Sequence, residues 1–172
     1  MPNAAGLNTT FTLTIFAKLD LGDYPASNWA LPLYSKGQDG AYGGWGVAST
    51  VNGSGVWWSD IVVEGVGQFN AHGYTNYTRN TWEMWTTVCD TTNGTLKTYQ
   101  GSTLVGNNTS ITPGPLRGNQ AVFLGANGIG ANGGLPSSFM KGSMGTVLMY
   151  NRALSASEVL QNYNAQKSRF GL

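Results

Sequence analysis

The sequence has few charged residues. Asp, Glu, Lys and Arg make up 10% of its 172 residues, against about 25% in an average soluble protein. The net charge is +1, and the Lys and Arg residues are scattered along the chain. A site for nucleic acid or for an anionic membrane surface would require a cluster of basic residues. We therefore expect neither as a partner.

Cysteine and long apolar runs are also scarce. Cys89 is the single cysteine, which excludes an internal disulfide framework, and its place in an expected strand favours a buried thiol. No apolar run approaches the length of a membrane span, and the start Met1-Pro2-Asn3 does not resemble a signal peptide. The sequence therefore predicts neither a membrane segment nor an export signal.

Closely spaced acidic residues are missing as well. Two carboxylates from one strand share a face, and could flank a glycosidic bond, when they are two residues apart. None of the eight acids has such a neighbour, and they are Asp20, Asp23, Asp39, Asp60, Glu64, Glu83, Asp90 and Glu158. Acids this dispersed indicate no calcium site, and no cofactor is expected. A carboxylate pair drawn from different strands stays open as an alternative.

Glycine and aromatic residues are abundant. The chain has 25 Gly and 12% aromatic residues, which is typical of a turn-rich β protein rather than a disordered chain. Thr10–Leu19 alternates Phe, Leu, Ile and Ala with mostly polar residues and predicts a half-buried strand. Residues 31–35, residues 44–50 and Val56–Val63 predict further strands, and Asn52-Gly53 predicts a hairpin between the last two.

The second half of the chain continues the pattern. Residues 64–80 are the least regular part. A meander of strands with glycine turns follows, and one more strand comes after a polar loop that contains proline. The strands expected there are Trp82–Asp90, Thr95–Gln100, residues 102–105 and residues 121–126.

The C-terminal segment predicts a strand followed by a helix. Residues 146–150 are apolar on both faces, which favours a strand in the middle of a sheet. Ser155 and Glu158 have the spacing of a capping box, and Leu154 and Val159 that of a hydrophobic staple. The helix that they open has a narrow apolar stripe, formed by Val159, Leu160 and Tyr163. We expect it to cover one margin of the β structure and to be the only helix.

Several of these segments resemble one known family. The run GSMGTVLMYNRALSASEV is similar to the closing strand and helix of laminin-G-like, or concanavalin A-like, lectin/glucanase jelly-roll modules. The strand FTLTIFAKL, the segment LPLYSKG, the strand AVFLGA and the spacing of Trp82, Asp90, Gly94 and Tyr99 fit the same pattern. The resemblance implies an all-β fold, a sandwich of two antiparallel sheets with one short C-terminal helix. It implies a single domain over residues 1–172, with a core at 10–164.

The ending QNYNAQKSRFGL resembles the version of this family found in virion proteins of tailed bacteriophages, notably those of cyanobacteria. Family modules usually begin with one or two additional strands, often with an acidic stretch, and only nine residues precede Thr10 here. Either the sheet has a free edge or another chain supplies the strand. We expect the second arrangement, with contact between subunits.

Aromatic residues around the hairpin form a candidate sugar-binding site. Its members are Trp45, Trp57, Trp58, Asp60 and Tyr74. Neighbours on a strand point to opposite faces, so one of Trp57 and Trp58 is expected in the core and the other on the outer face. A loop or a neighbouring subunit could instead cover the outer ring. Asp60 could orient a sugar hydroxyl beside Trp58.

The favoured function is that of a non-catalytic virion structural protein on the outer surface of the particle, either a capsid decoration protein or a tail-associated module. Its partners would be other virion proteins or further copies of itself, with a cell-surface glycan as an additional ligand. The alternative is a lectin-like carbohydrate-binding module. An enzyme comes third, either a glycosidase or a polysaccharide lyase that uses His72, Tyr74 and Arg79. The arginine-rich and Gln-Ile-His patterns of lyases in this family are absent.

Overall fold

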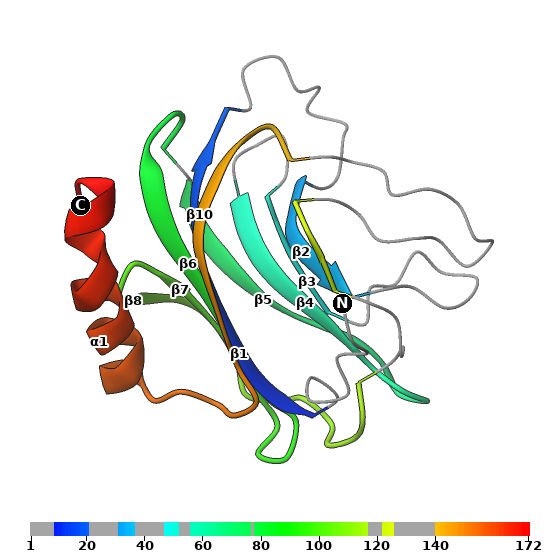
Figure 1. The fold of residues 1–172 in the computed structure, drawn as a ribbon. Coiled ribbons are helices and arrows are strands. Elements are labelled where there is room, and N and C mark those ends of the chain that lie inside the picture. The colour runs from blue at the N-terminus through cyan, green and yellow to red at the C-terminus, as the bar shows by residue number, and fades with distance from the viewer. Residues whose placement is uncertain are drawn as a thin grey trace.

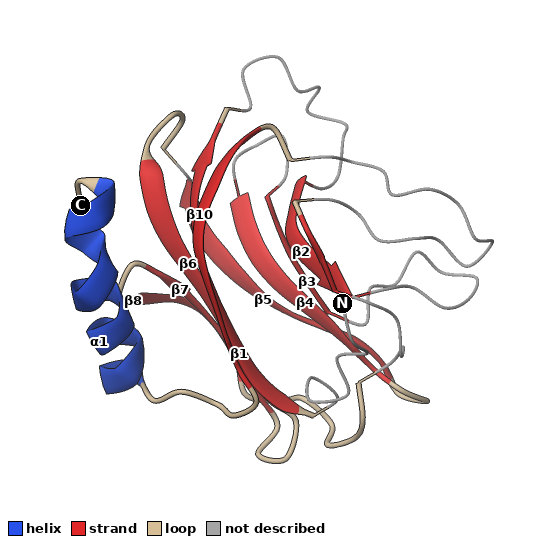
Figure 2. Cartoon of the chain, in the orientation of Figure 1, coloured by secondary structure: helices blue, strands red, loops and turns tan. Residues whose placement is uncertain are grey.

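The computed structural model describes residues 9–20, 31–36, 47–51, 56–76, 78–116, 122–125 and 140–172. Within these ranges, side chains are described for all residues except 31–36, 47–51, 56–58, 72–76 and 122–123. Two five-stranded antiparallel sheets face each other, and a short helix near the C-terminus lies against the outer side of one of them (Figures 1 and 2). This architecture confirms the predicted all-β sandwich.

Sheet A is the sheet that carries the helix, and its strand order is β10-β1-β6-β7-β8. Its strands are β1 (Thr10–Leu19), β6 (Trp82–Asp90), β7 (Thr95–Gln100), β8 (Thr103–Asn108) and β10 (Gly142–Tyr150). All neighbouring strands run antiparallel. The predicted bounds of β1, β6 and β7 are confirmed.

Sheet B has the strand order β5-β4-β3-β2-β9. Its strands are β2 (Leu31–Lys36), β3 (Val47–Val51), β4 (Val56–Val63), β5 (Gly67–Asn76) and β9 (Val122–Leu124). The antiparallel pairing of β3 with β4 confirms the hairpin predicted between them, although Asn52 and Gly53 lie outside the described residues. The prediction that residues 64–80 are irregular is wrong, because β5 occupies most of them. The apolar pattern of β5 is weak. Of its described side chains, only Phe69 and Ala71 pack against the core.

The main hydrophobic core fills the space between the sheets. From β1 it takes the apolar side chains that the period of two predicts, Phe11, Leu13, Ile15 and Ala17. Sheet B contributes Ile61, Val63 and Ala71, and β6 contributes Cys89. The Cys89 thiol is buried, as predicted, and burial raises its pKa to about 12.

A second core lies between sheet A and the C-terminal segment. Phe16, Met84, Val88 and Tyr99 on the outer side of sheet A pack with Leu154 and Val159. The prediction that β1 is half-buried is therefore wrong: Thr12, Thr14 and Phe16, on its second face, are each 0% exposed. The prediction that residues 146–150 form a central strand is wrong, because β10 is an end strand among the described residues. Val147 packs on the main core and Tyr150 on the second core, while Met149 is exposed.

The helix α1 (Ala156–Gln166) begins as the sequence predicts. Ser155 is the N-cap, its hydroxyl accepts from the Glu158 amide, and the Glu158 carboxylate accepts from the Ser155 amide. Leu154 and Val159 pack in the same cluster, as a staple requires. Leu160 is exposed, so the buried stripe is narrower than predicted.

A 3-10 helix, η2 (Lys167–Phe170), follows α1 directly, so α1 is not the only helical element. Phe170 anchors η2 on sheet A. Its ring stacks on Phe16 with centroids 4.5 Å apart and lies 4.8 Å from the Trp82 ring. A Cβ added at Gly145 would overlap the Phe170 ring, so a glycine is needed there for the ring to reach the sheet.

Glu158 is expected to titrate far below an ordinary carboxyl group. Hydrogen bonding from Arg152, followed by that from Ser155, lowers the pKa of Glu158 from 4.5 to about 2. Because the folded pKa is the lower one, the stabilisation is present above pH 4.5 and is lost as the pH falls towards 2. An NMR titration of the Glu158 carboxyl carbon should give a midpoint near 2, moving upwards in Arg152→Ala. A midpoint near 4.5 in the unmodified protein would contradict the capping geometry.

Candidate functional site

The candidate site is the face of sheet B that points away from the core, on strands β4 and β5. Side chains on β4 alternate strictly: Ile61 and Val63 belong to the main core, and Asp60 and Val62 occupy the opposite face. On β5, Gln68 and Asn70 lie directly across from Val62 and Asp60 and are exposed. We call the side chains of Asp60, Val62, Gln68 and Asn70 the β4–β5 outer face.

The orientation of β4 is fixed by a buried hydroxyl cluster between the sheets. Ser59 Oγ lies 2.6 Å from Thr87 Oγ1 and 2.9 Å from Thr98 Oγ1, and the Thr98 hydroxyl donates to the Ala71 carbonyl oxygen at 3.0 Å. A hydroxyl buried without a partner costs free energy, so Ser59 is held towards sheet A. The side chain of Asp60 must then point away from it.

Asp60 is almost fully buried in this face. The residue is 6% exposed, and the Gln68 amide nitrogen donates to its Oδ1 at 3.3 Å. The Asn108 amide donates to the Asn70 carbonyl oxygen at 2.9 Å, which ties β8 of sheet A to β5. A ligand on the β4–β5 outer face would therefore meet the exposed amides of Gln68 and Asn70 before the Asp60 carboxylate.

The predicted aromatic residues are placed by backbone register. Trp57 and Trp58 lie in β4, where Trp58 is opposite Thr50 on β3 and His72 on β5. Tyr74 lies two residues after His72 on β5. The sheet thus brings four of the five predicted residues onto two adjacent strands. The side chains of Trp57, Trp58 and Tyr74 and all of Trp45 lie outside the described residues, so the assignment of one indole to each face stays a prediction.

Gln68 and Asn70 were not predicted as site residues. They lie in the stretch that lacks a strong strand pattern, and only the pairing with β4 reveals that they share a face with Asp60. The signal was present in the alternation of Gln68 and Asn70 with Phe69 and Ala71, which is the pattern of a half-buried strand.

Acidic side chains elsewhere have structural partners. Asp20 is paired with Arg79 at 3.0 Å, and Glu158 with Arg152 at 2.7 Å. The Asp90 carboxylate accepts from Asn93 and from the amide of Thr92. These hydrogen bonds outweigh the effect of partial burial and lower the pKa of Asp90.

Burial raises the pKa of the Glu83 carboxyl group above its ordinary value. It lies in β6 of sheet A and accepts from the Thr78 amide and from Gln100. Of the three residues considered for a lyase, Arg79 pairs with Asp20, and His72 and Tyr74 lie in β5 with side chains outside the described residues. In the described ranges, no three His, Cys, Asp or Glu side chains are grouped as metal ligands. None of the helices described there is long and apolar enough to span a membrane.

Comparison with known structures identifies sandwiches of the same fold. A CBM40 module of the Ruminococcus gnavus IT-sialidase, solved with α2,3-sialyllactose, superimposes with a TM-score of 0.72 at 15% identity, over 92% of this chain and 84% of that one. A heptameric SAP-like pentraxin from Limulus polyphemus gives a TM-score of 0.64 at 13% identity, over 89% of this chain and 69% of that one. At these identities the likeness establishes the fold alone.

A third similar structure is the binding domain of Botulinum neurotoxin DC in complex with rat synaptotagmin II. It gives a TM-score of 0.60 at 9% identity, over 94% of this chain, and this chain spans 37% of its length.

A comparison with curated proteins finds no match to the sequence. At the level of families, residues 1–160 match a laminin G family described as the concanavalin A-like lectin/glucanases superfamily. The resemblance seen in the strand and helix motifs is thereby confirmed, and the chain belongs to this superfamily.

Proposed function

We propose that this chain is a non-catalytic, lectin-like carbohydrate-binding module whose site is the β4–β5 outer face. The observation that carries the proposal is the register of β4 and β5, which sets Trp58 opposite His72 and Asp60 opposite Asn70. Aromatic rings offer an apolar surface to the C–H face of a sugar, and amides and carboxylates bond its hydroxyl groups. The CBM40 module of similar fold was solved with a bound sialyl sugar, which supports the same class of ligand here.

The composition of this face favours a cell-surface glycan with many hydroxyl groups over a strongly charged ligand. Asp60 is its only charged side chain among the described residues of β4 and β5, and it is bonded to Gln68. The exposed amides of Gln68 and Asn70 can each donate and accept. Binding would then depend on hydrogen bonds and ring stacking, and we expect weak dependence on salt.

A role without catalysis is supported by the carboxylates of the described residues. Hydrolysis of a glycosidic bond requires two carboxyl groups about 5–9.5 Å apart that flank one bond. Asp20, Asp90 and Glu158 are each engaged by a partner in a different part of the molecule. Glu83 lies in sheet A, and Glu64 is exposed in the turn after β4. Asp60 would act in this proposal by orienting a hydroxyl group rather than by transferring a proton.

Trp58→Ala is expected to abolish most glycan binding. Loss of a stacking platform should weaken affinity about tenfold or more, equivalent to ~1.4 kcal/mol. A glycan panel identifies a binder, and calorimetry then compares the two proteins. Trp82→Ala is the matched control, because Trp82 packs against Phe170 under the C-terminal segment. It should lower thermal stability and leave glycan affinity unchanged. Equal affinity in Trp58→Ala would contradict the proposed site.

A virion structural role is the second candidate function. It is supported by the position of β10, which has no neighbouring strand on its outer edge among the described strands. A second copy or another virion protein could pair with that edge on the outer surface of a particle. Light scattering on the purified protein separates the candidates. A stable oligomer that responds to no glycan would favour the structural role, and a monomer that binds a glycan would favour the lectin.

A further inference from the structure

The two exposed amides of the β4–β5 outer face lie in a fixed arrangement on neighbouring strands (Figure 1). Gln68 and Asn70 are two residues apart on β5, so their side chains leave the same face of the sheet. Alternate residues of an antiparallel strand are about 7 Å apart. Each of the two has a buried β4 residue directly across from it, Val62 for Gln68 and Asp60 for Asn70.

The Asp60 carboxylate decides which end of the Gln68 amide a ligand meets. Asp60 is 6% exposed, and its Oδ1 accepts from Gln68 Nε2 at 3.3 Å. An ionised carboxylate has no donor, so the nitrogen end of the Gln68 amide is the end that faces it. Gln68 Oε1 therefore points away from Asp60 on an exposed side chain. The face thus offers a ligand a hydrogen-bond acceptor whose direction is set by a buried charge.

Asn70 supplies the complementary donor. Its main chain is fixed, because the Asn108 amide of β8 donates to the Asn70 carbonyl oxygen at 2.9 Å. Its side chain is exposed, and the Nδ2 group carries two N–H donors. An acceptor at Gln68 and a donor at Asn70 therefore stand on alternate residues of one strand.

We propose that Gln68 and Asn70 together recognise the acetamido group of a neutral N-acetylated sugar. This ligand class rests on the glycan site proposed above and makes it specific. The acetamido N–H donates to Gln68 Oε1, and the acetamido carbonyl oxygen accepts from Asn70 Nδ2. A secondary amide that is bonded at both ends spans about 8 Å, which matches the about 7 Å between alternate strand residues whose side chains can tilt.

An acetamido group suits this pair better than two sugar hydroxyl groups do. Its donor and its acceptor lie at opposite ends of a rigid plane, so both bonds form without fixing a rotor. Each hydroxyl group has an O–H bond that rotates and has to be held in one direction. A negatively charged sugar is disfavoured, because the Asp60 carboxylate lies directly across from Asn70. Asp60 thus acts through Gln68 as a positioning residue.

The test is a nitrogen-15 NMR titration of the whole chain with N-acetyl-D-glucosamine and N-acetyl-D-galactosamine. D-Glucose and D-galactose are the counterparts that lack the acetamido group. We expect saturable shifts of the Gln68 and Asn70 side-chain amides with an N-acetylated sugar, and an affinity about tenfold lower for its counterpart. Asn70→Ala should reduce this preference to about threefold or less. Asn107→Ala is the matched control, because Asn107 is exposed on β8 of sheet A, and it should keep the full preference.

Asp60→Asn tests the positioning role. The new side chain can donate as well as accept, so it no longer decides which end of the Gln68 amide faces it. The preference for the N-acetylated sugar should then fall as it does in Asn70→Ala, whereas a purely structural role would lower thermal stability and leave the preference unchanged. The unmodified protein gives a second readout that needs no variant. The downfield side-chain proton of Gln68 should resonate further downfield than that of Gln161, which is exposed on α1, because a carboxylate accepts from Gln68.

Two negative results separate this proposal from the glycan site itself. If a sugar binds in a way that depends on Trp58, but the N-acetylated and plain sugars bind equally, the glycan site stands and the acetamido proposal is overturned. If no sugar shifts the amides of the β4–β5 outer face, both are overturned. A tenfold preference that survives in Asn70→Ala also contradicts the proposal, because the acetamido group then binds elsewhere.

Discussion

Gly142→Ala is expected to destabilise the protein by roughly 2–6 kcal/mol, the sum of backbone strain and steric overlap. Gly142 opens β10 opposite Leu19 and has φ of +143°, a conformation that residues with a side chain rarely adopt. An added Cβ would overlap the carbonyl oxygen of Lys18 and lie 3.0 Å from Leu19 Cα. These are backbone atoms of β1, and they cannot withdraw without opening the pairing of β1 with β10.

Gly67→Ala is a closely matched control for this effect. Gly67 has φ of +147°, and a Cβ added there would have nothing within 4 Å. Gly67→Ala should lower the free energy of unfolding only by the cost of backbone strain, about 1–3 kcal/mol. Denaturant unfolding of both variants measures the difference, which reports the overlap with β1 alone. Equal losses of stability in the two variants would mean that the backbone of β1 shifts to accommodate the Cβ added at Gly142.

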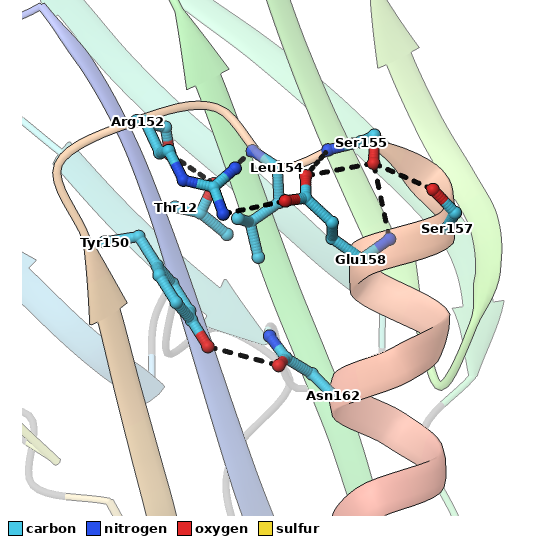
Figure 3. A network of polar contacts seen from close by, with 8 residues as sticks. All are labelled: Thr12, Tyr150, Arg152, Leu154, Ser155, Ser157, Glu158 and Asn162. Atoms are coloured by element: carbon cyan, nitrogen blue, oxygen red, sulfur yellow. Dashed lines mark hydrogen bonds and ion pairs between the residues drawn. The ribbon is translucent and has the colours of Figure 1, made fainter.

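Thr12→Val is expected to lower the free energy of unfolding by about 3 kcal/mol and to loosen the segment between β10 and α1. Thr12 is 0% exposed. Its hydroxyl donates to the Arg152 carbonyl oxygen and accepts from the Leu154 amide, both at 2.9 Å (Figure 3). Valine has the same shape without the hydroxyl, so both backbone groups would lose their partner inside the protein.

The measurement is denaturant unfolding together with hydrogen exchange at the Leu154 amide. Exchange there should accelerate in Thr12→Val more than at amides in the middle of β6. Thr12→Ser keeps the hydroxyl and loses one methyl group, about 0.8 kcal/mol, and should retain the protection of Leu154. If Thr12→Ser and Thr12→Val behave alike, the hydroxyl does not hold this segment.

Elements with a strong local pattern were predictable from the sequence. The bounds of β1, β4, β6 and β7 follow from period-two alternation and glycine turns. The start of α1 follows from Ser155 and Glu158, because a capping box is decided within four residues. β5 was missed because its polar residues and glycines give little strand signal, and pairing with β4 supplies what its own sequence does not.

The candidate site was predictable in part. Trp58 and Asp60 could be assigned to one strand, since they lie in a clear strand pattern. That His72 and Asn70 lie directly across from them depends on the β4–β5 register, which begins with an irregularity between Val56 and Trp57. A shift of one residue would change every pair across the two strands, so local alternation could assign Asn70 to a face but could not place it opposite Asp60.

The sequence alone thus determined the fold family, most strand positions and the capped start of the helix, because each is encoded by residues close together in the chain. Only the tertiary structure decided that both faces of β1 are buried and that β10 ends its sheet among the described strands. These features depend on contacts between distant segments, such as that of Thr12 with Arg152, which are 140 residues apart. Packing of the C-terminal segment onto sheet A creates them, and it has no short-range signature.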